Sequence, residues 1–589
     1  MAINNLSHGK TMSLAFFFRR FFEILKPESN FYWLTLVYGV GVSLFSLATP
    51  ISVQFLINTV ANTALTAPLV VLSVTLFGLL ILFGLLNALR IHLMELFARR
   101  FYARMVAEIS LISVYAQNPF FGDNKKSALF NRYFDVINVQ IALPILFIGG
   151  FTVVLQVAVG FVLVSLYHPL FLVFTLVMSA LIWVIWLAWG GRAIRTGIDL
   201  SHAKHETAAW LETIGGSNGF FKSQRRIDYA LDRTDDYTHK YIKERKRHFR
   251  EHFSQTLAFL LMYAGASAVL LGLGGYLVIQ GQLTLGQLVA AELVLSIAFF
   301  GVAQLGTYLS YFYDLCAAIE ELTMFYDVEQ ENPTGDDPVT GEDHTLAFRA
   351  VRGTARHEDA QLNFEIPSGS IVMASASHHG VQRLFTNLIK MHELPKSGIA
   401  TLGALDFQDI EAHNLRNNIH VMERATFVGM TIREYLSLSC PTTAPGRIVG
   451  ALETVGLTET ISTFEKGLDT PVASTGWPFS TVELQQLKLA NALLEQPRIL
   501  VLSRLFDLLD EEHLAAAIND LRDQAYSTVI YFSNRRIDLG FDSFLYLESH
   551  QQRFFDNFED FCFAVNGEPP RKPGRRPMLS RESINVVGE

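Results

Sequence analysis

Residues 31–89 read FYWLTLVYGVGVSLFSLATPISVQFLINTVANTALTAPLVVLSVTLFGLLILFGLLNAL and contain no Asp, Glu, Lys or Arg. A membrane-spanning helix needs about 20 apolar residues. These 59 residues therefore predict two spans, with the turn between them in the polar run Asn58–Pro68. The alternative, a buried hairpin of a soluble protein, fits poorly because so long an uncharged stretch is hard to keep soluble.

Two later blocks of the chain have the same character. Residues 136–191 are also free of charge and divide at Tyr167–Pro169. Residues 252–313 contain one acid, Glu292, and divide near Gln280–Gln282. The sequence therefore predicts six spans. Glu292 either faces a cavity, where it can help bind a cationic substrate group, or lies close enough to the outer surface to meet water.

The overall composition agrees with this reading. At 589 residues the chain exceeds one ordinary domain. It is 50% hydrophobic and only 17% charged, whereas soluble chains carry about 25% charge. A net charge of −9 gives no argument for a nucleic-acid partner. Three cysteines without a CxxC pair support neither a disulfide framework nor a zinc site. The chain reads as an integral membrane protein with a soluble part.

Basic residues set the expected orientation. Segments 90–135 and 192–250 are rich in Lys and Arg, whereas the three short turns on the other side carry none. The positive-inside rule places these connections and both termini in the cytoplasm. We expect membrane helices to continue into these connections. Residues 14–25 alternate phenylalanines with arginines, which predicts an amphipathic helix on the inner membrane face.

The character of the chain changes after Phe325. Short β-like runs such as Ile499–Leu502 and Thr528–Phe532 alternate with helical ones such as Val381–Lys390, as in an α/β domain. The predicted organisation is an amphipathic cytoplasmic segment, a six-span domain, a linker, an α/β domain and a disordered tail, at residues 1–30, 31–325, 326–345, 346–566 and 567–589.

An ordered series of short segments carries a family resemblance. The series comprises Gly281–Ala290, Pro395–Ile399, Thr431–Glu434, Gly467–Thr470 and Gln496–Leu500. In order and spacing it resembles a half-transporter of the ABC exporter family over residues 15–565. The resemblance implies an α-helical six-span membrane domain followed by an α/β domain like that of P-loop NTPases. It also implies a bacterial inner membrane, a dimer partner of the same type and an unknown transported substrate.

The nucleotide-binding motifs implied by the resemblance lack the residues that bind phosphate and Mg²⁺ in the family. A phosphate loop needs glycines, a Lys for the phosphates and a hydroxyl for Mg²⁺. Here Val381 stands in place of the Lys and Gln382 in place of the hydroxyl. Arg383 or protonated histidines can still attract an anion. No intact Gly-x-x-x-x-Gly-Lys-Ser/Thr occurs elsewhere. The corresponding loop positions are Ser375, His378, His379, Gly380, Val381, Gln382 and Arg383.

The other motifs are altered as well. Ser503 and Arg504 replace the Asp-Glu pair that holds Mg²⁺ and orients water in the Walker B motif. Glu423 replaces the Q-loop Gln, and Asn534 the H-loop His. Asp510 of the D-loop survives. The signature Leu-Ser-Gly-Gly-Gln becomes Phe479, Ser480, Thr481, Val482 and Glu483.

These losses predict a domain with no catalytic residues, no metal site and no tight ATP binding of its own. In the ABC family each nucleotide lies between two domains, so a homodimer would have no competent site. ATP and Mg²⁺ then depend on a competent partner, and a heterodimer is favoured over a homodimer. The alternatives are a non-transporting membrane scaffold or regulator and an ATP-independent transporter.

Two histidine pairs suggest metal binding only superficially. His202 and His205 lack the i, i+4 spacing of zinc-protease helices, so we expect an exposed helix face. His378 and His379 are adjacent in a loop, where two residues rarely ligate one ion.

Overall fold

The computed structural model describes residues 14–62, 66–117, 127–331, 335, 339, 343–356, 358–424, 427–439, 445–523 and 527–567. The chain divides into two compact units, Met1–Glu331 and Asn332–Glu589. The predicted tail from residue 568 onward, parts of the predicted linker and residues 1–13 lie outside the described residues.

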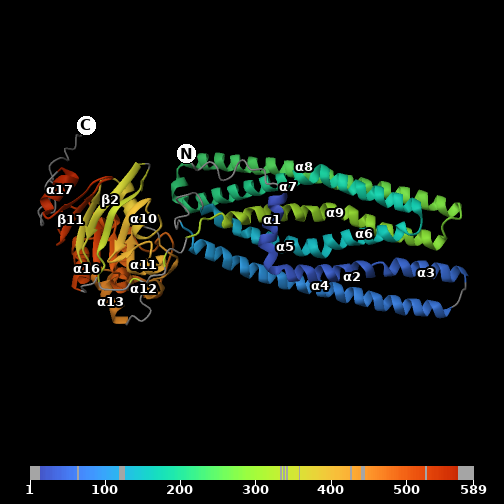
Figure 1. The fold of residues 1–589 in the computed structure, drawn as a ribbon, viewed down its shortest axis with the longest axis horizontal. Helices are drawn as coiled ribbons and strands as arrows, with labels where there is room; N and C mark the ends of the chain where they lie inside the picture. Colours follow the sequence, from blue (N-terminus) through green and yellow to red (C-terminus); the bar gives the residue numbers. More distant parts are fainter. Residues whose placement is uncertain are drawn as a thin grey trace, which may run out of the picture. The chain divides into compact units, whose positions relative to one another are not determined.

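The first unit is a bundle of long helices (Figure 1). Six helical segments within the described residues are long and apolar enough to cross a membrane, which confirms the predicted six spans. The turns fall where the sequence predicts them. The helices are α1 (Leu14–Leu25), α2 (Ser29–Phe45), α3 (Ala48–Asn62), α4 (Thr66–Val114), α5 (Asp135–Ile145), α6 (Phe151–Ser165), α7 (Pro169–Gly216), α8 (Gln224–Ile279) and α9 (Leu285–Tyr326), with short segments η1 (Lys26–Glu28), η3 (Ser127–Phe134), η4 (Leu146–Gly150) and η5 (Asn218–Lys222).

Local chemistry sets the helix starts. Pro169 begins α7 because its fixed φ suits a first helical position, and the His168 ring accepts a hydrogen bond from Leu170 N at 3.2 Å. Thr284 and Gln287 form a reciprocal capping box at the start of α9. Helices of 42–56 residues extend roughly 60–80 Å, about twice the apolar thickness of a bilayer. The predicted long extensions are confirmed.

Helix α1 matches the predicted amphipathic segment and runs across the long helices of the bundle (Figure 1). It joins η1, where Glu28 is fully buried. Both carboxylate oxygens of Glu28 accept hydrogen bonds from Arg104 of α4, at 2.8 and 2.9 Å. Arg104 also donates to Ile24 O at 2.7 Å. One buried ion pair thus attaches the α1–η1 corner to α4.

A π-helical turn, η4, interrupts the helix between α5 and α6, one residue after Ile145 and two after Pro144. Proline supplies no N–H, and wide turns leave carbonyls poorly paired. The fully buried Arg90 of α4 donates to two of these carbonyls, Phe147 O at 2.7 Å and Ile148 O at 3.1 Å. The distortion is therefore stabilised by a charge from a neighbouring helix.

The second unit is an α/β domain. Its strands are β1 (Leu346–Ala355), β2 (Glu358–Ile366), β3 (Ile371–Ala376), β4 (Ser397–Leu402), β5 (Leu405–Asp406), β6 (Ile419–Met422), β7 (Met430–Thr431), β8 (Pro471–Val472), β9 (Ile499–Leu502), β10 (Thr528–Phe532), β11 (Ser543–Leu547) and β12 (Gln552–Phe555). Its helices are α10 (His379–Ile389), α11 (Ala412–Asn418), α12 (Ile432–Ser439), α13 (Pro445–Thr454), α14 (Thr458–Thr463), α15 (Thr481–Glu495), α16 (Glu511–Asp523) and α17 (Phe558–Asn566), with turns η6 (Gly467–Asp469) and η7 (Arg504–Leu508).

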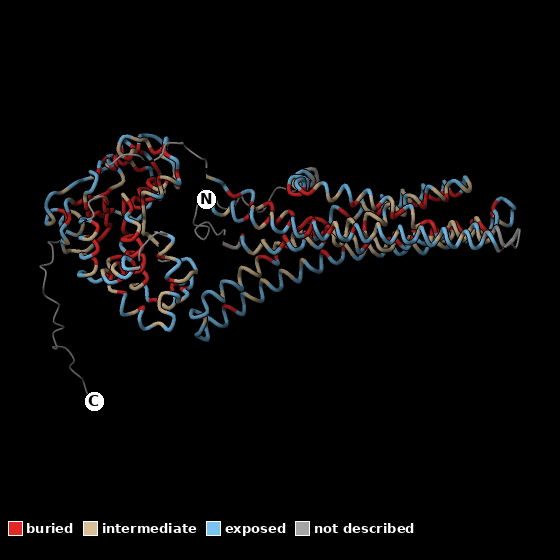
Figure 2. The backbone as a smooth tube through the Cα atoms, turned by 90° about the horizontal axis from the view of Figure 1, so that it is seen from below, coloured by how far each residue is buried: buried red, intermediate tan, exposed pale blue. Residues whose placement is uncertain are grey.

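A six-stranded sheet in the order β12-β11-β3-β10-β9-β6 forms the centre of this unit. Strands β11, β3, β10, β9 and β6 pair in parallel. Side chains alternate between two hydrophobic cores: Leu500 and Leu502 face one, whereas Ile499 and Val501 face the other. Buried residues accordingly gather inside this unit, whereas the long helices carry much exposed surface (Figure 2). A second, four-stranded antiparallel sheet has the order β2-β1-β4-β5.

Candidate functional site

The carboxyl ends of β3, β9 and β10 meet at one edge of the parallel sheet, the usual place for ligands in such sheets. Arg504, after β9, points its guanidinium toward the end of β3. It lies 3.5 Å from Ser375 Oγ and 3.3 Å from Ala376 O. The Asn534 amide, after β10, lies 3.4 Å from Ser375 Oγ. With the amide rotated so that its nitrogen and oxygen exchange places, the nitrogen donates to Ser533 O at 3.3 Å. The oxygen then accepts from the Arg504 guanidinium, also at 3.3 Å. The fold therefore brings three of the altered motifs together.

In the loop between β3 and α10, the His378 side chain caps the N-terminus of α10. His378 Nδ1 accepts the Gly380 N–H at 3.2 Å, so the ring covers the start of α10. A Cβ at Gly380 would lie 2.9 Å from Arg356 Cγ, which leaves little room there. Val381 and Gln382 are buried in the helix.

His379 and Arg383 are exposed. Partial burial, followed by the nearby positive charge of Arg383, lowers the pKa of His379. His379 therefore carries little positive charge at neutral pH, and Arg383 is the stronger anion attractor of the two.

Ser503 and Asp510 flank the short turn that follows β9. Ser503 is buried, its N–H donates to Met422 O at 3.1 Å, and its hydroxyl accepts from Leu505 N at 3.4 Å. The hydroxyl caps this turn. Asp510 is exposed immediately before α16.

Asp507 is a residue of this edge that sequence reasoning missed. Its carboxylate accepts from Ser533 Oγ at 2.6 Å, from Asn534 N at 3.2 Å and from the Tyr531 hydroxyl. It thereby fixes the loop after β10 against the turn after β9. A lone Asp in a polar turn gives no distinguishing signal in the sequence.

Glu423, at the position of the metal-contacting Gln, is bound inside its own domain. It accepts from Thr386 Oγ1 at 2.8 Å and from Lys390 Nζ at 2.5 Å. The Lys390 and Glu423 side chains are only 12% and 13% exposed. Burial lowers the pKa of Lys390, and Glu423 opposes that shift. The carboxylate is therefore used in an internal ion pair.

His392, two residues beyond Lys390, gives a pH prediction. Burial, followed by the charges of Lys390 and Arg416, lowers its pKa to about 3. The unfolded chain takes up this proton below about pH 6.5, the folded chain only near pH 3. Stability should therefore fall as the pH drops through this window, by up to about 2 kcal/mol at pH 5. Thermal unfolding of the full chain between pH 7.5 and 5 should be less pH-dependent in His392→Gln.

The exposed His550 provides the control for this measurement. His550→Gln should keep the pH dependence of the wild-type chain. Equal slopes in all three proteins would contradict a buried neutral imidazole at position 392.

The segment matching the family signature begins helix α15. Ser480 Oγ accepts from Glu483 N at 3.3 Å, and the Glu483 carboxylate accepts from Ser480 N at 2.8 Å and from Thr460 Oγ1 at 3.2 Å. This capping box places a negative charge at the helix N-terminus, where an anion would otherwise bind. The remaining members of the segment are the buried Phe479, the exposed Thr481 and the half-buried Val482.

Glu292 lies within the membrane unit, on α9. It is half-buried, and Ser296 Oγ donates to its Oε1 at 3.2 Å. Its Oε2 is buried and has no hydrogen-bond partner among the described residues. A role in substrate binding stays a prediction.

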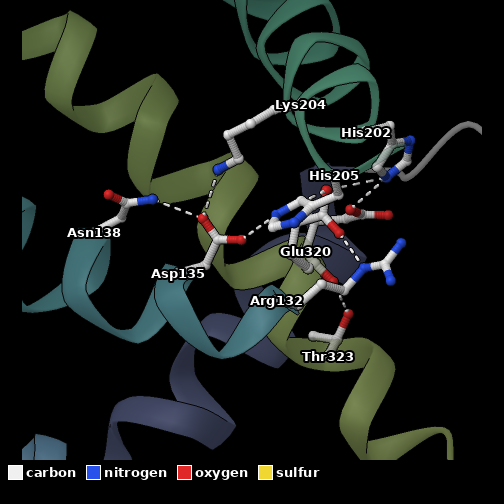
Figure 3. A network of polar contacts seen from close by, with 9 residues as sticks. Arg132, Asp135, Asn138, His202, Lys204, His205, Glu320 and Thr323 are labelled. Carbon is white, nitrogen blue, oxygen red and sulfur yellow. Dashed lines mark hydrogen bonds and ion pairs between the residues drawn. The ribbon is translucent and has the colours of Figure 1, made fainter. Parts of the chain in front are cut away.

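A polar network joins α5, α7 and α9 (Figure 3). His205 is 6% exposed, and its Nε2 donates to Asp135 Oδ2 at 2.6 Å. Lys204 lies 3.0 Å from the other oxygen of Asp135. His202 is half-buried and contacts Glu320 at 2.9 Å. The predicted exposed helix face is therefore wrong, because this side of α7 packs against carboxylates from distant parts of the sequence.

A pocket of about 260 Å³ adjoins this network. Four helices, α5, α7, α8 and α9, supply its walls. The charged and polar residues that line it include Asp135, Asn138, Lys204, Tyr241, Arg245 and Asp314. Such a mixture of charges can bind a zwitterionic or polar ligand.

Comparison with known proteins places these observations in context. Residues 32–303 match the family described as ABC transporter transmembrane region. ABC multidrug transporter mdr2 of Aspergillus fumigatus is 28% identical over 269 residues, which cover 42% of this chain but only 33% of the fungal protein. Leukotoxin translocation ATP-binding protein LktB of Mannheimia glucosida is 22% identical over 497 residues, covering 81% of this chain and 68% of LktB.

A solved structure shares the fold. A bacterial Atm1-family ABC exporter with ATP bound superposes with a TM-score of 0.76 at 16% identity, covering 90% of this chain and 96% of that chain. Together with the six apolar helices and the α/β unit, this confirms the predicted fold class.

Proposed function

We propose that this multi-pass chain, whose membrane domain is of the ABC exporter type, forms half of a translocation path and pairs with a catalytically competent second subunit. Its own α/β unit then acts as a pseudo-ATPase that supports dimerisation and regulation. The polar pocket between α5, α7, α8 and α9 is a candidate part of the path. Exposed apolar side chains along α4, among them Val70, Val74 and Phe77, suit contact with lipid or with the second subunit.

The position of Arg504 carries this proposal. Its guanidinium lies at the end of β3, where the resemblance expects Mg²⁺ and phosphate. A positive charge there disfavours a divalent cation by direct repulsion. The buried Val381 and Gln382 supply no lysine and no hydroxyl. The residues present do not fit Mg-ATP, so we assign this chain no hydrolytic step.

The position of the Glu483 carboxylate at the N-terminus of α15 favours a heterodimer. In the ABC family the signature of one domain faces the phosphate loop of the other. Here the N-terminus of α15 already holds its own carboxylate. A partner's nucleotide would meet negative charge in place of two glycines. One site of a mixed pair would lack its phosphate loop, and the other would close weakly. A homodimer would have no competent site at all.

Affinity purification of the full-length chain from native membranes tests the pairing. We expect an ABC subunit with intact Walker motifs to copurify at a 1:1 ratio. The reconstituted pair should hydrolyse ATP at a rate that collapses when the partner's catalytic Glu is changed. Arg504→Ala in this chain, the matched control, should leave that rate within about twofold, because Arg504 holds no reacting group.

Two outcomes would count against the proposal. Self-association alone, with no competent partner, would favour a non-transporting scaffold or regulator. Substrate uptake by vesicles containing this chain alone, driven by an ion gradient and lost in Glu292→Gln, would favour an ATP-independent transporter.

A further inference from the structure

Three side chains of the polar network, one from α7 and two from α9, bring possible metal-ligand atoms close together (Figure 3). His202 comes from α7, whereas Glu320 and Glu321 are consecutive on α9. One ligand atom from each lies within 4.8 Å of the other two. His202 Nε2 is 2.9 Å from Glu320 Oε2 and 3.7 Å from Glu321 Oε1. The cluster lies apart from the nucleotide edge, on the portions of α7 and α9 that follow the charge-poor blocks ending at residues 191 and 313.

These separations suit a common ion. Zn²⁺ binds imidazole nitrogen and carboxylate oxygen at about 2.0–2.2 Å, which places two tetrahedral ligands about 3.3–3.6 Å apart. The two measured distances bracket that range. Small side-chain rotations would therefore bring His202, Glu320 and Glu321 into contact with one metal.

An unpartnered oxygen points into the cluster. Glu321 is fully buried, and its Oε1 has no hydrogen-bond partner among the described residues. Its other oxygen accepts from Arg132 Nε at 2.5 Å. A buried carboxylate oxygen without a partner is costly. Arg132 orients the carboxylate so that Oε1 faces His202, in the way that outer partners orient metal ligands.

The charges around the cluster favour an added cation. Asp135, Glu320 and Glu321 carry three negative charges, against the two positive charges of Arg132 and Lys204. His205 binds Asp135 and lies 4.0 Å from Glu321 Oε1. Metal binding requires only His202 to be neutral, and before the imidazoles are counted the three carboxylates exceed the two cations by one charge.

We propose that His202 Nε2, Glu320 and Glu321 Oε1 form a binding site for a divalent transition metal of the Zn²⁺ class, which ties α7 to α9. Imidazole and carboxylate ligands suit such ions better than Mg²⁺ or Ca²⁺, which prefer oxygen alone. Water completes the coordination. The side chains of His202 and Glu320 are 23% and 17% exposed, so an ion can enter from solvent.

Cobalt titration of the full chain tests this site. The protein is purified with a tag free of histidine, stripped with EDTA and titrated with CoCl₂, whose visible absorption reports nitrogen and oxygen coordination. We expect one Co²⁺ per chain that ZnCl₂ displaces. His202→Gln and Glu320→Gln should each weaken binding about 100-fold or more, because loss of an outer partner alone costs 10–100-fold. His239→Gln, at an exposed position on α8, is the matched control and should bind normally.

A second readout separates binding from folding. Zn²⁺ should raise the unfolding temperature of the wild type and of His239→Gln, but not that of His202→Gln. Equal Co²⁺ affinity in all variants would overturn the proposal, as would folded wild-type protein without stoichiometric binding. If His202→Gln does not fold, Glu320→Gln decides between these outcomes.

Discussion

Purified full-length protein in lipid nanodiscs is expected to release phosphate from Mg-ATP no faster than background. The reason lies at the carboxyl edge of the parallel sheet, where Arg504 contacts the end of β3 and Val381 and Gln382 are buried. Bound metal supplies several kcal/mol of transition-state stabilisation in phosphoryl transfer. Losing about 4 kcal/mol lowers the rate about 1000-fold. We therefore expect at least this deficit relative to an intact bacterial ABC exporter assayed in parallel.

The assay includes variants at two acids that lie at motif positions, Asp510 and Glu483. Asp510→Asn and Glu483→Gln should leave the background rate unchanged. Measurable hydrolysis that disappears in either variant would mean that unconventional residues carry the reaction, and the pseudo-ATPase assignment would then be wrong.

Arg104→Ala is expected to give a large loss of stability in the membrane unit. Glu28 is 0% exposed, and Arg104 donates to both of its oxygens. Removing one partner of a buried pair leaves an uncompensated charge, which costs about 3–5 kcal/mol. The Ile24 carbonyl loses its hydrogen bond from Arg104 as well.

Thermal unfolding in one detergent measures this effect against a control on the same helix. Arg99 of α4 pairs with Glu95, but these side chains are 72% and 56% exposed. Arg99→Ala should cost less than about 1 kcal/mol, as exposed pairs do. Equal shifts in unfolding temperature for the two variants would contradict a structural role for the buried pair.

Most of the fold could be predicted because its signals are local. Charge-free blocks marked the spans, and the turn at Tyr167–Pro169 was set by proline, which begins α7. Strands Ile499–Leu502 and Thr528–Phe532 were recognisable as short apolar runs, and both are confirmed. The division of the first span into α2 and α3 carries a proline signal too, because Pro50 lies in the first turn of α3.

The candidate site was only partly predictable. The structure brings Ser375, Arg504 and Asn534, which the sequence analysis named as separate motif positions, to one edge of the sheet. The hydrogen-bond partners of other candidate residues could not be predicted from the sequence. The pairing of Glu423 with Lys390 spans 33 residues, and that of His205 with Asp135 spans 70. Such contacts depend on how whole helices pack, which the sequence around each residue does not report.

The hydrogen bonds from Arg90 to the π-helical turn η4 have a consequence for how the bundle can move. If that turn became a regular α-helix, Arg90 would lose its hydrogen bonds to Phe147 O and Ile148 O. A buried guanidinium without these partners is high in free energy, so the change is strongly disfavoured. We expect α4 to travel with the α5–α6 segment as one rigid lever during any opening of the bundle. Hinge motion is then confined to the other helices. Among their described residues, no buried arginine binds the carbonyls of a distorted turn in a neighbouring helix.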